Sequence, residues 1–191
     1  MEQITDAIDD EDLGRLEELL QEGVLDHVEE DEEALKYILI NFVNSMRYGK
    51  PREKMFSVHA FVRVMRHVPE SPTIYNIATI MASEGKLTDV VLALMLKGGS
   101  PSSINQQFLR QFISPEARGV TPLLREIIEL EIEAHSQGKS FKEYTEEQGH
   151  PYSLEEVLTR LEGEMNQVGG RKRRKTRKGR ARKGKKHTRR R

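Results

Sequence analysis

The 191-residue sequence contains no cysteine and no tryptophan, and only 6% of its residues are aromatic. The absence of cysteine excludes disulfides, thiolate metal sites and thiol chemistry, and it fits a reducing compartment. No run approaches the roughly 20 apolar residues that a bilayer requires. The first six residues include two acidic side chains and no basic one, where a secretory signal would be basic. We therefore expect an intracellular protein with no membrane partner.

The formal net charge is zero, but the charged residues are divided unevenly along the chain. Residues 171–191 carry 15 of the 31 Lys and Arg residues and none of the 31 Asp and Glu residues. Their formal charge is therefore +15, and that of residues 1–170 is −15. Screening limits each field to about 8 Å in physiological salt. A partner thus meets either an acidic body or a basic tail, and the two are analysed separately.

The basic tail has one apolar side chain, Ala181, so it cannot bury a core. We predict an acidic α-helical domain over residues 1–168 and a disordered polybasic tail over residues 169–191, hinged at Gly169-Gly170. Lys and Arg neutralise phosphates and release counterions, but the tail has no aromatic residue for stacking on bases. It is therefore predicted to bind DNA or RNA without reading sequence, through Arg171, Lys172, Arg173, Arg174, Lys175, Arg177, Lys178, Arg180, Arg182, Lys183, Lys185, Lys186, Arg189, Arg190 and Arg191.

The composition of the tail also permits two other roles. Residues 171–175 have the composition of a nuclear or nucleolar targeting signal, and a polybasic segment also binds anionic lipid. Nucleic-acid binding is our first interpretation, targeting alone is the second and membrane binding the last.

Hydrophobic residues of the body recur at helical spacing, and no alternating pattern typical of strands is present. We therefore predict an all-α body of eight or nine short helices, stacked as helical hairpins. The periodic series cover residues 13–20, 35–46, 61–68, 74–81, 87–94, 104–112, 123–130 and 154–165.

Residues typical of helix ends agree with these series. Ser71-Pro72 and Thr121-Pro122 each place a capping hydroxyl before a proline, which predicts a helix start, and Ser153 with Glu156 forms a candidate capping box. Glycines that follow apolar series predict helix ends at which the backbone takes positive φ. These glycines are Gly23, Gly85, Gly98, Gly99 and Gly138.

Three segments resemble ankyrin repeats. Residues 12–23 and 85–99 are similar to the second helix of a repeat, and Gly119-Val120-Thr121-Pro122-Leu123-Leu124 resembles the opening of a first helix. The resemblance covers residues 1–135 and implies an unidentified protein partner bound on a concave face. The chain departs from the family at Leu124, where a His is usual, and in the spacing from Thr73 to Thr121, which exceeds the usual repeat of about 33 residues. An irregular helical bundle is the alternative.

The tail itself, a Gly-Gly hinge followed by Arg-Lys-Thr-Arg-Lys, resembles the basic tails of proteins from nucleocytoplasmic large DNA viruses. Ankyrin-like proteins are abundant in that group. This resemblance implies handling of viral DNA or RNA, in the nucleus of the infected cell or in the virion.

No motif of an enzyme, metal site or cofactor site is present. The six histidines include no pair at the spacing that places two ligands over one metal, and His59 lies in an apolar helix, where a core or interface role is expected. Gly138-Lys139-Ser140 lacks the upstream glycine and strand of a phosphate loop, so it is interpreted as a turn. We expect a non-enzymatic protein without a cofactor or a metal.

Two further charged clusters have a structural and a functional interpretation. Residues 29–33 are five consecutive carboxylates, which suit a helix N-terminus or a basic partner, the chain's own tail included. A smaller basic cluster is either a solvated face or a source of additional phosphate contacts. It consists of Arg47, Lys50, Arg52, Lys54, Arg63 and Arg66, with Tyr48 and Phe56 between them.

Overall fold

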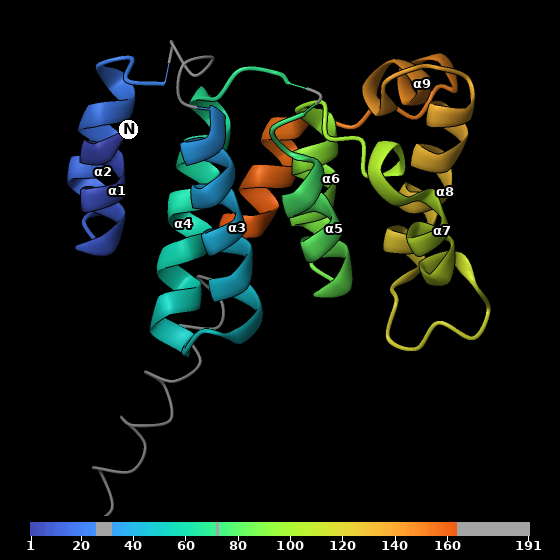
Figure 1. The fold of residues 1–191 in the computed structure, drawn as a ribbon, viewed down its shortest axis with the longest axis horizontal. Coiled ribbons are helices and arrows are strands. Elements are labelled where there is room, and N and C mark those ends of the chain that lie inside the picture. Colours follow the sequence, from blue (N-terminus) through green and yellow to red (C-terminus); the bar gives the residue numbers. More distant parts are fainter. Residues whose placement is uncertain (26–31, 72, 164–191) are drawn as a thin grey trace, which may run out of the picture.

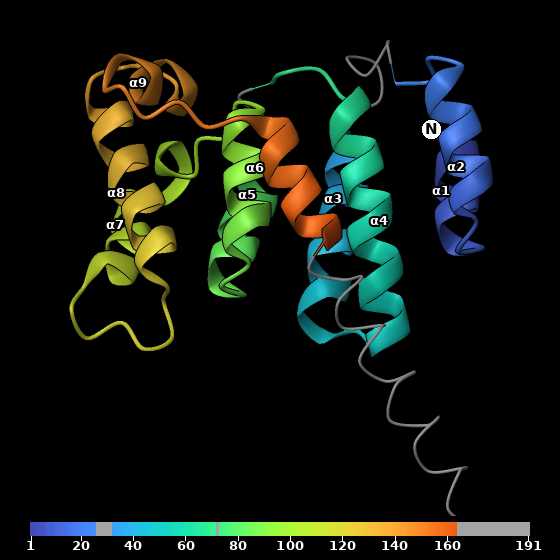
Figure 2. The same cartoon turned by 180° about the vertical axis from the view of Figure 1, so that it is seen from behind.

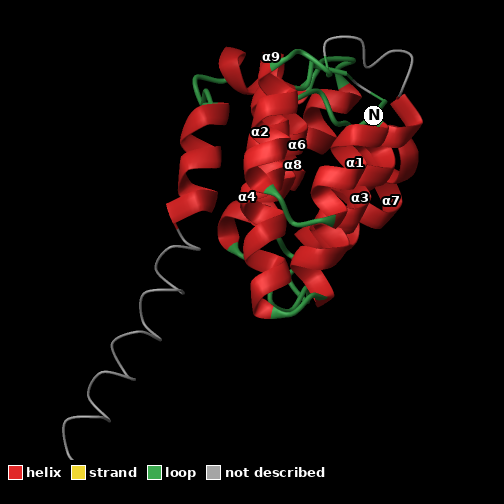
Figure 3. Ribbon diagram, turned by 90° about the vertical axis from the view of Figure 1, so that its left-hand side faces the viewer, coloured by secondary structure: helices red, strands yellow, loops and turns green. Residues whose placement is uncertain are grey.

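The computed structural model describes residues 1–25, 32–71 and 73–163, and these residues form helices and loops without a strand (Figure 3). The all-α class is therefore confirmed. The helices are α1 (Glu2–Asp9), α2 (Leu13–Gln21), α3 (Glu32–Tyr48), α4 (Pro51–His67), α5 (Asn76–Glu84), α6 (Thr88–Leu96), α7 (Ser102–Ile113), α8 (Pro122–Ser136), α9 (Phe141–Glu147) and a last helix over residues 154–163.

Successive helices pack as hairpins, and the hairpins stack side by side in a row (Figure 1). The first helices of the pairs, α1, α3, α5 and α7, form one layer, in which α5 packs against both α3 and α7. The second helices, α2, α4, α6 and α8, form the other layer. There α2 packs against α4, and α6 packs against α8.

Helix α6 lies at the centre of the core. All of its residues from Val90 to Leu96 are buried, because α5, α8, α9 and residues 154–163 surround it. A helix that is apolar on every side is stable only in such an enclosed position. The apolar run therefore fixes which hairpin occupies the middle of the stack.

One of the two predicted Ser/Thr-Pro helix starts is confirmed. The Thr121 hydroxyl accepts the N–H of Leu124 at 3.1 Å and caps α8. Ser71-Pro72 was wrongly predicted to start a helix, since α5 begins at Asn76 after a turn. The Ser71 N–H donates to the carbonyl of Lys97 at 2.9 Å, and this bond holds the segment against the end of α6. The next helix therefore begins several residues later, at Asn76.

Three of the glycine helix ends have the predicted positive φ, at Gly23 (77°), Gly98 (102°) and Gly138 (69°). Gly85 ends α5 as predicted, but its φ is −72°, and Gly99 does not have the predicted positive φ either. A Cβ at Gly85 would lie 2.7 Å from Cγ of Arg47. Glycine is needed there for the close approach of the arginine stem and not for backbone conformation.

Two helices of the structure have no counterpart among the predicted series. Helix α1 buries Ile4 and Ala7, and α9 begins at Ser140, whose hydroxyl accepts the N–H of Glu143 at 3.2 Å. The Gly138-Lys139-Ser140 turn is therefore present, and its last residue is also the cap of α9.

Candidate functional site

The fifteen predicted nucleic-acid-binding residues of the tail, together with its glycine hinge, lie outside the described residues. The structure does describe the helix that leads to them, over residues 154–163. This helix follows α9 and runs back along the stack, where it lies against the second layer between α4 and α6 (Figure 2). The basic tail therefore follows an element that packs on the middle of the body.

Apolar and capping contacts hold the last helix in place. Val157, Leu158 and Leu161 are buried, as their helical spacing predicts. The Ser153 hydroxyl accepts the N–H of Glu156 at 3.4 Å, which is one half of the predicted capping box. Just before the helix, the ring of Tyr152 stacks on Phe141 of α9 at 5.9 Å between centroids.

Ion pairs on both sides fix the last helix further. On α4, Nη2 of Arg66 lies 2.7 Å from Oε1 of Glu155 and 3.4 Å from Oε2 of Glu162. The hydrogen bond from Arg66 lowers the pKa of the Glu155 carboxyl. On α6, Asp89 accepts from Nε of Arg160 at 2.9 Å. Arginines and carboxylates separated by 71 to 96 residues in sequence thus connect three helices.

A cavity of about 320 Å³ lies where the last helix meets α4 and the start of α6. Its apolar lining includes Val58, Leu87 and Leu161. Two lysines line it as well, and both already have carbonyl acceptors: Nζ of Lys54 donates to Arg47 at 3.0 Å, and Nζ of Lys86 donates to Arg118 at 2.5 Å. The cavity therefore has an apolar wall and two ammonium groups that already donate hydrogen bonds to backbone carbonyls.

The second basic cluster is largely neutralised within the body. Each of its arginines has a carboxylate within 3.1 Å, and Lys50 lies 3.7 Å from Glu53. The arginine pairs are Arg47 with Glu84, Arg52 with Glu11, Arg63 with Glu17, and Arg66 with Glu155. These arginines connect neighbouring hairpins, or α4 and the last helix, so little uncompensated positive charge is left on this face for phosphate contacts.

The acidic run is described only in part, since residues 26–31 lie outside the described residues. Glu32 and Glu33 occupy the first turn of α3, where the helix dipole favours negative charge. Lys36 lies 3.2 Å from Glu32 and 2.8 Å from Glu33. The pKa of Glu32 is lowered first by the hydroxyl of Thr73, at 2.6 Å, and then by Lys36. The positions of Glu32 and Glu33 thus fit the interpretation of the acidic run as a helix N-terminus.

Glu131 of α8 is a buried carboxyl that the sequence interpretation missed. It is 1% exposed, and its Oε1 accepts the hydroxyl of Ser100 at 2.7 Å and the N–H of Ser102 at 3.4 Å. Burial raises the pKa of Glu131 to about 7, and these hydrogen bonds offset part of the shift. The signal was available, because Glu131 continues the buried stripe of Leu124, Ile127 and Ile128 at helical spacing.

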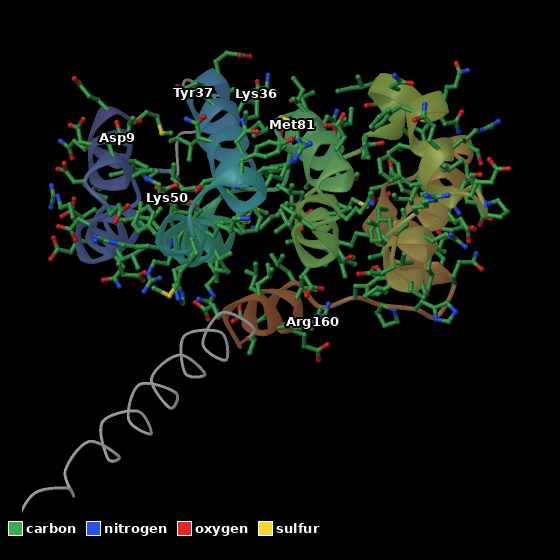
Figure 4. All side chains as sticks on the ribbon, turned by 90° about the horizontal axis from the view of Figure 1, so that it is seen from below. Asp9, Lys36, Tyr37, Lys50, Met81 and Arg160 are labelled. Carbon is green, nitrogen blue, oxygen red and sulfur yellow. The ribbon has the colours of Figure 1, made fainter. Side chains whose placement is uncertain are left out.

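Exposed large apolar side chains lie on three helices of the first layer, and two more, Tyr48 and Met55, lie at the end of α3 and on α4. Tyr37 of α3, Ile77 of α5 and Ile104 of α7 are 63%, 48% and 53% exposed, and they come from three successive hairpins. In Figure 4, Tyr37 and Met81 lie on the side of the stack opposite Arg160 and the last helix. The first layer therefore offers a partner a face other than the one that the chain itself covers.

The described ranges contain no group of three or more His, Asp and Glu side chains arranged to hold a metal ion. His59 is half-buried on α4. No helix in these ranges is both long and apolar enough to span a membrane. Comparison with protein-family models, curated proteins and solved structures gave no significant match.

Proposed function

We propose that the protein is a non-enzymatic adaptor, in which the helical body binds a protein partner and the basic tail binds nucleic acid without sequence preference. The observation that carries the proposal is the division of charge, with +15 in residues 171–191 and −15 in the rest. A segment of such density binds phosphates by counterion release, whatever the base sequence.

The ion pairs of the body support this division of labour. The arginines of the second basic cluster are matched by carboxylates of neighbouring segments, so this cluster adds little uncompensated positive charge to that of the tail. A body of net negative charge repels a polyanion, and binding is therefore expected to depend on the tail.

The first-layer face supports the protein-binding half of the proposal. Tyr37, Ile77 and Ile104 give three successive hairpins an exposed apolar contact, and residues 154–163 cover the opposite layer instead. Exposed large apolar side chains that form a patch are typical of a protein-interaction surface. An ankyrin-like mode of binding and a viral origin remain part of this proposal.

The alternative function is a protein-interaction module whose tail is only a nuclear or nucleolar targeting signal. Deleting residues 171–191 separates the two. For the adaptor, deletion abolishes binding of the purified protein to a duplex of about 20 base pairs. For the alternative, purified full-length and truncated proteins bind the duplex equally poorly, and only cellular location changes. Circular dichroism of the truncated protein checks that the body stays folded.

A scrambled tail is the matched control for sequence-independent binding. Rearranging residues 171–191 at constant composition should leave the affinity within about twofold, whereas replacing their Lys and Arg by Gln should abolish binding. If about 6 to 10 phosphates are engaged, raising salt from about 50 to about 200 mM should weaken binding about 10³- to 10⁵-fold. A flat salt response, or a strong preference for one base sequence, would contradict the proposal.

A further inference from the structure

A second cavity, of about 220 Å³, lies where the turn after α1 meets α3 and α4. The α1 side contributes Asp9 and Glu11, α3 contributes Phe42, and α4 contributes Glu53, Phe56 and Ser57. Three carboxylates from two separate segments thus share one cavity with two phenylalanine rings. Figure 4 labels Asp9 on α1 and Lys50 at the turn before α4.

The three carboxylates differ in how far the fold already uses them. Glu11 lies 2.8 Å from Nη2 of Arg52, and Oε2 of Glu53 accepts the N–H of Lys50 at 2.9 Å. Asp9 is exposed and has no ion pair within the described ranges. The cavity is therefore lined by one carboxylate without an ion pair and by two that the fold already uses.

Ser57 adds a hydroxyl to the cavity. The residue lines the cavity and is 4% exposed, and its hydroxyl makes no hydrogen bond in the parts of the chain that the structure describes. Its oxygen is not among the fully buried atoms that lack a partner, so it is open to the cavity. A ligand that enters the cavity and carries N–H donors would complete the bonding of Ser57 as well as of the carboxylates.

We propose that this cavity binds a Lys or Arg side chain of the chain's own basic tail, residues 171–191. Such a side chain has an aliphatic stem that packs on apolar walls and a cationic head that donates several hydrogen bonds. Phe42 and Phe56 fit the stem, while Asp9, Glu11 and Ser57 fit the head. The inference rests on the proposed function, because it names what restrains the nucleic-acid-binding tail.

The tail begins within reach of the cavity. Leu161 of the last helix lines the first cavity together with Lys54 and Val58 of α4. Glu53 and Ser57, the residues just before these two in α4, line the second cavity. The two cavities are thus separated by about one helix diameter, roughly 10 Å. The chain from Leu161 to Arg171 can span up to about 33 Å.

Occupation of the cavity holds one tail cation away from phosphate, so nucleic acid and the body compete for the tail. A single exposed pair is weak, but tethering keeps the local concentration of tail cations high. Salt screens both interactions, and the restraint should therefore be strongest at low salt.

The test compares two isosteric substitutions in the full-length protein, Asp9→Asn and Asp10→Asn. Both remove one negative charge from adjacent exposed positions, but only Asp9 lines the cavity. We expect Asp9→Asn to tighten binding of a duplex of about 20 base pairs by about two- to fivefold at about 50 mM salt, and Asp10→Asn to change it less than about 1.5-fold. Equal effects of the two substitutions would overturn the inference.

Zero-length carbodiimide cross-linking of the full-length protein locates the contact without relying on nucleic acid. We expect concentration-independent cross-links from tail lysines to Asp9, Glu11 or Glu53, which Asp9→Asn reduces and added duplex removes. Cross-links spread evenly over Glu2, Asp6, Asp10 and Glu22 would show that the tail has no preference for the cavity and would overturn the inference. Cross-links between molecules would also overturn it, because the cavity would then hold the tail of a second copy. Failure to bind duplex together with cross-links at the cavity would overturn the proposed function and leave this inference standing.

Discussion

The two ends of the helical stack differ in one carboxylate, because only the α7–α9 end buries an acidic side chain among the described residues. At the α1–α4 end, carboxylates lie at the surface, where Glu11 and Glu17 meet arginines of α4. At the α7–α9 end, Glu131 is buried and meets only neutral donors from Ser100 and Ser102. Surface carboxylates change the charge that a partner sees at little cost in stability, whereas a buried one makes stability itself depend on pH.

The largest effect on stability is expected for Glu131→Gln. The pKa of Glu131 is raised from 4.5 to about 7, so the folded protein holds this proton more tightly than the unfolded chain. Its stabilising contribution is complete below about pH 4.5 and is lost as the pH rises through about 7, in total about 3 kcal/mol. Gln stays neutral at every pH. In urea unfolding, the free energy of unfolding of the variant relative to the wild type should therefore rise by about that amount between about pH 4 and 8.

Glu129→Gln is the matched control for that measurement. Glu129 lies on the exposed side of the same helix, and its substitution should leave the difference from wild type nearly independent of pH. A Glu131→Gln curve that runs parallel to the wild-type curve at all pH values would show that the two ends do not differ in this way.

An intermediate effect is expected for Asp12→Ala. The Asp12 carboxylate accepts the N–H of Arg15 at 2.9 Å and caps α2. Loss of such a cap costs about 1 kcal/mol, which a shift of the urea midpoint would report. Asp12→Asn keeps the acceptor and should cost less than half as much. If Asp12→Ala and Asp12→Asn lost the same unfolding free energy, Asp12 would stabilise the protein through its charge and not through its cap.

The smallest effect is expected for Glu17→Gln. Oε2 of Glu17 lies 2.9 Å from Nε of Arg63, but the two side chains are 38% and 28% exposed. A pair of this exposure contributes about 0 to 1 kcal/mol, and salt weakens it. The difference in unfolding free energy should therefore shrink between about 0.05 and about 1 M salt. If the variant lost well over about 1 kcal/mol of unfolding free energy and the loss persisted in high salt, the Glu17 pair would behave like a buried group, and the two ends would not differ as described.

Most of the fold could be predicted from the sequence, because apolar residues at helical spacing mark helices that bury one face. Short helices escaped this reasoning. Helix α9 has seven residues and buries only Phe141, Tyr144 and Thr145, too few to establish a period. Helix α1 likewise offers two buried residues, Ile4 and Ala7, within an acidic segment.

Contacts between distant segments could not be predicted from periodicity. The pairing of Arg66 with Glu155 joins residues 89 positions apart, and nothing local to either residue indicates the other. The cavity of Asp9, Phe56 and Ser57 depends in the same way on how α1 meets α4. Composition alone predicted the tail as a nucleic-acid-binding segment. The surface of the body that we propose to bind the tail could not be predicted, because it is formed by tertiary packing.

The position of residues 154–163 has a consequence for synthesis of the protein. The ribosome completes α4 and α6 before it makes the helix that packs between them, because α6 ends at Leu96 and this helix comes after α7, α8 and α9. At about 5 to 20 residues per second, synthesis of the intervening chain takes roughly 3 to 13 s. During that interval the nascent chain exposes the apolar surface that Val157, Leu158 and Leu161 later cover. A chaperone that binds this surface would have to release it only after the last helix has emerged.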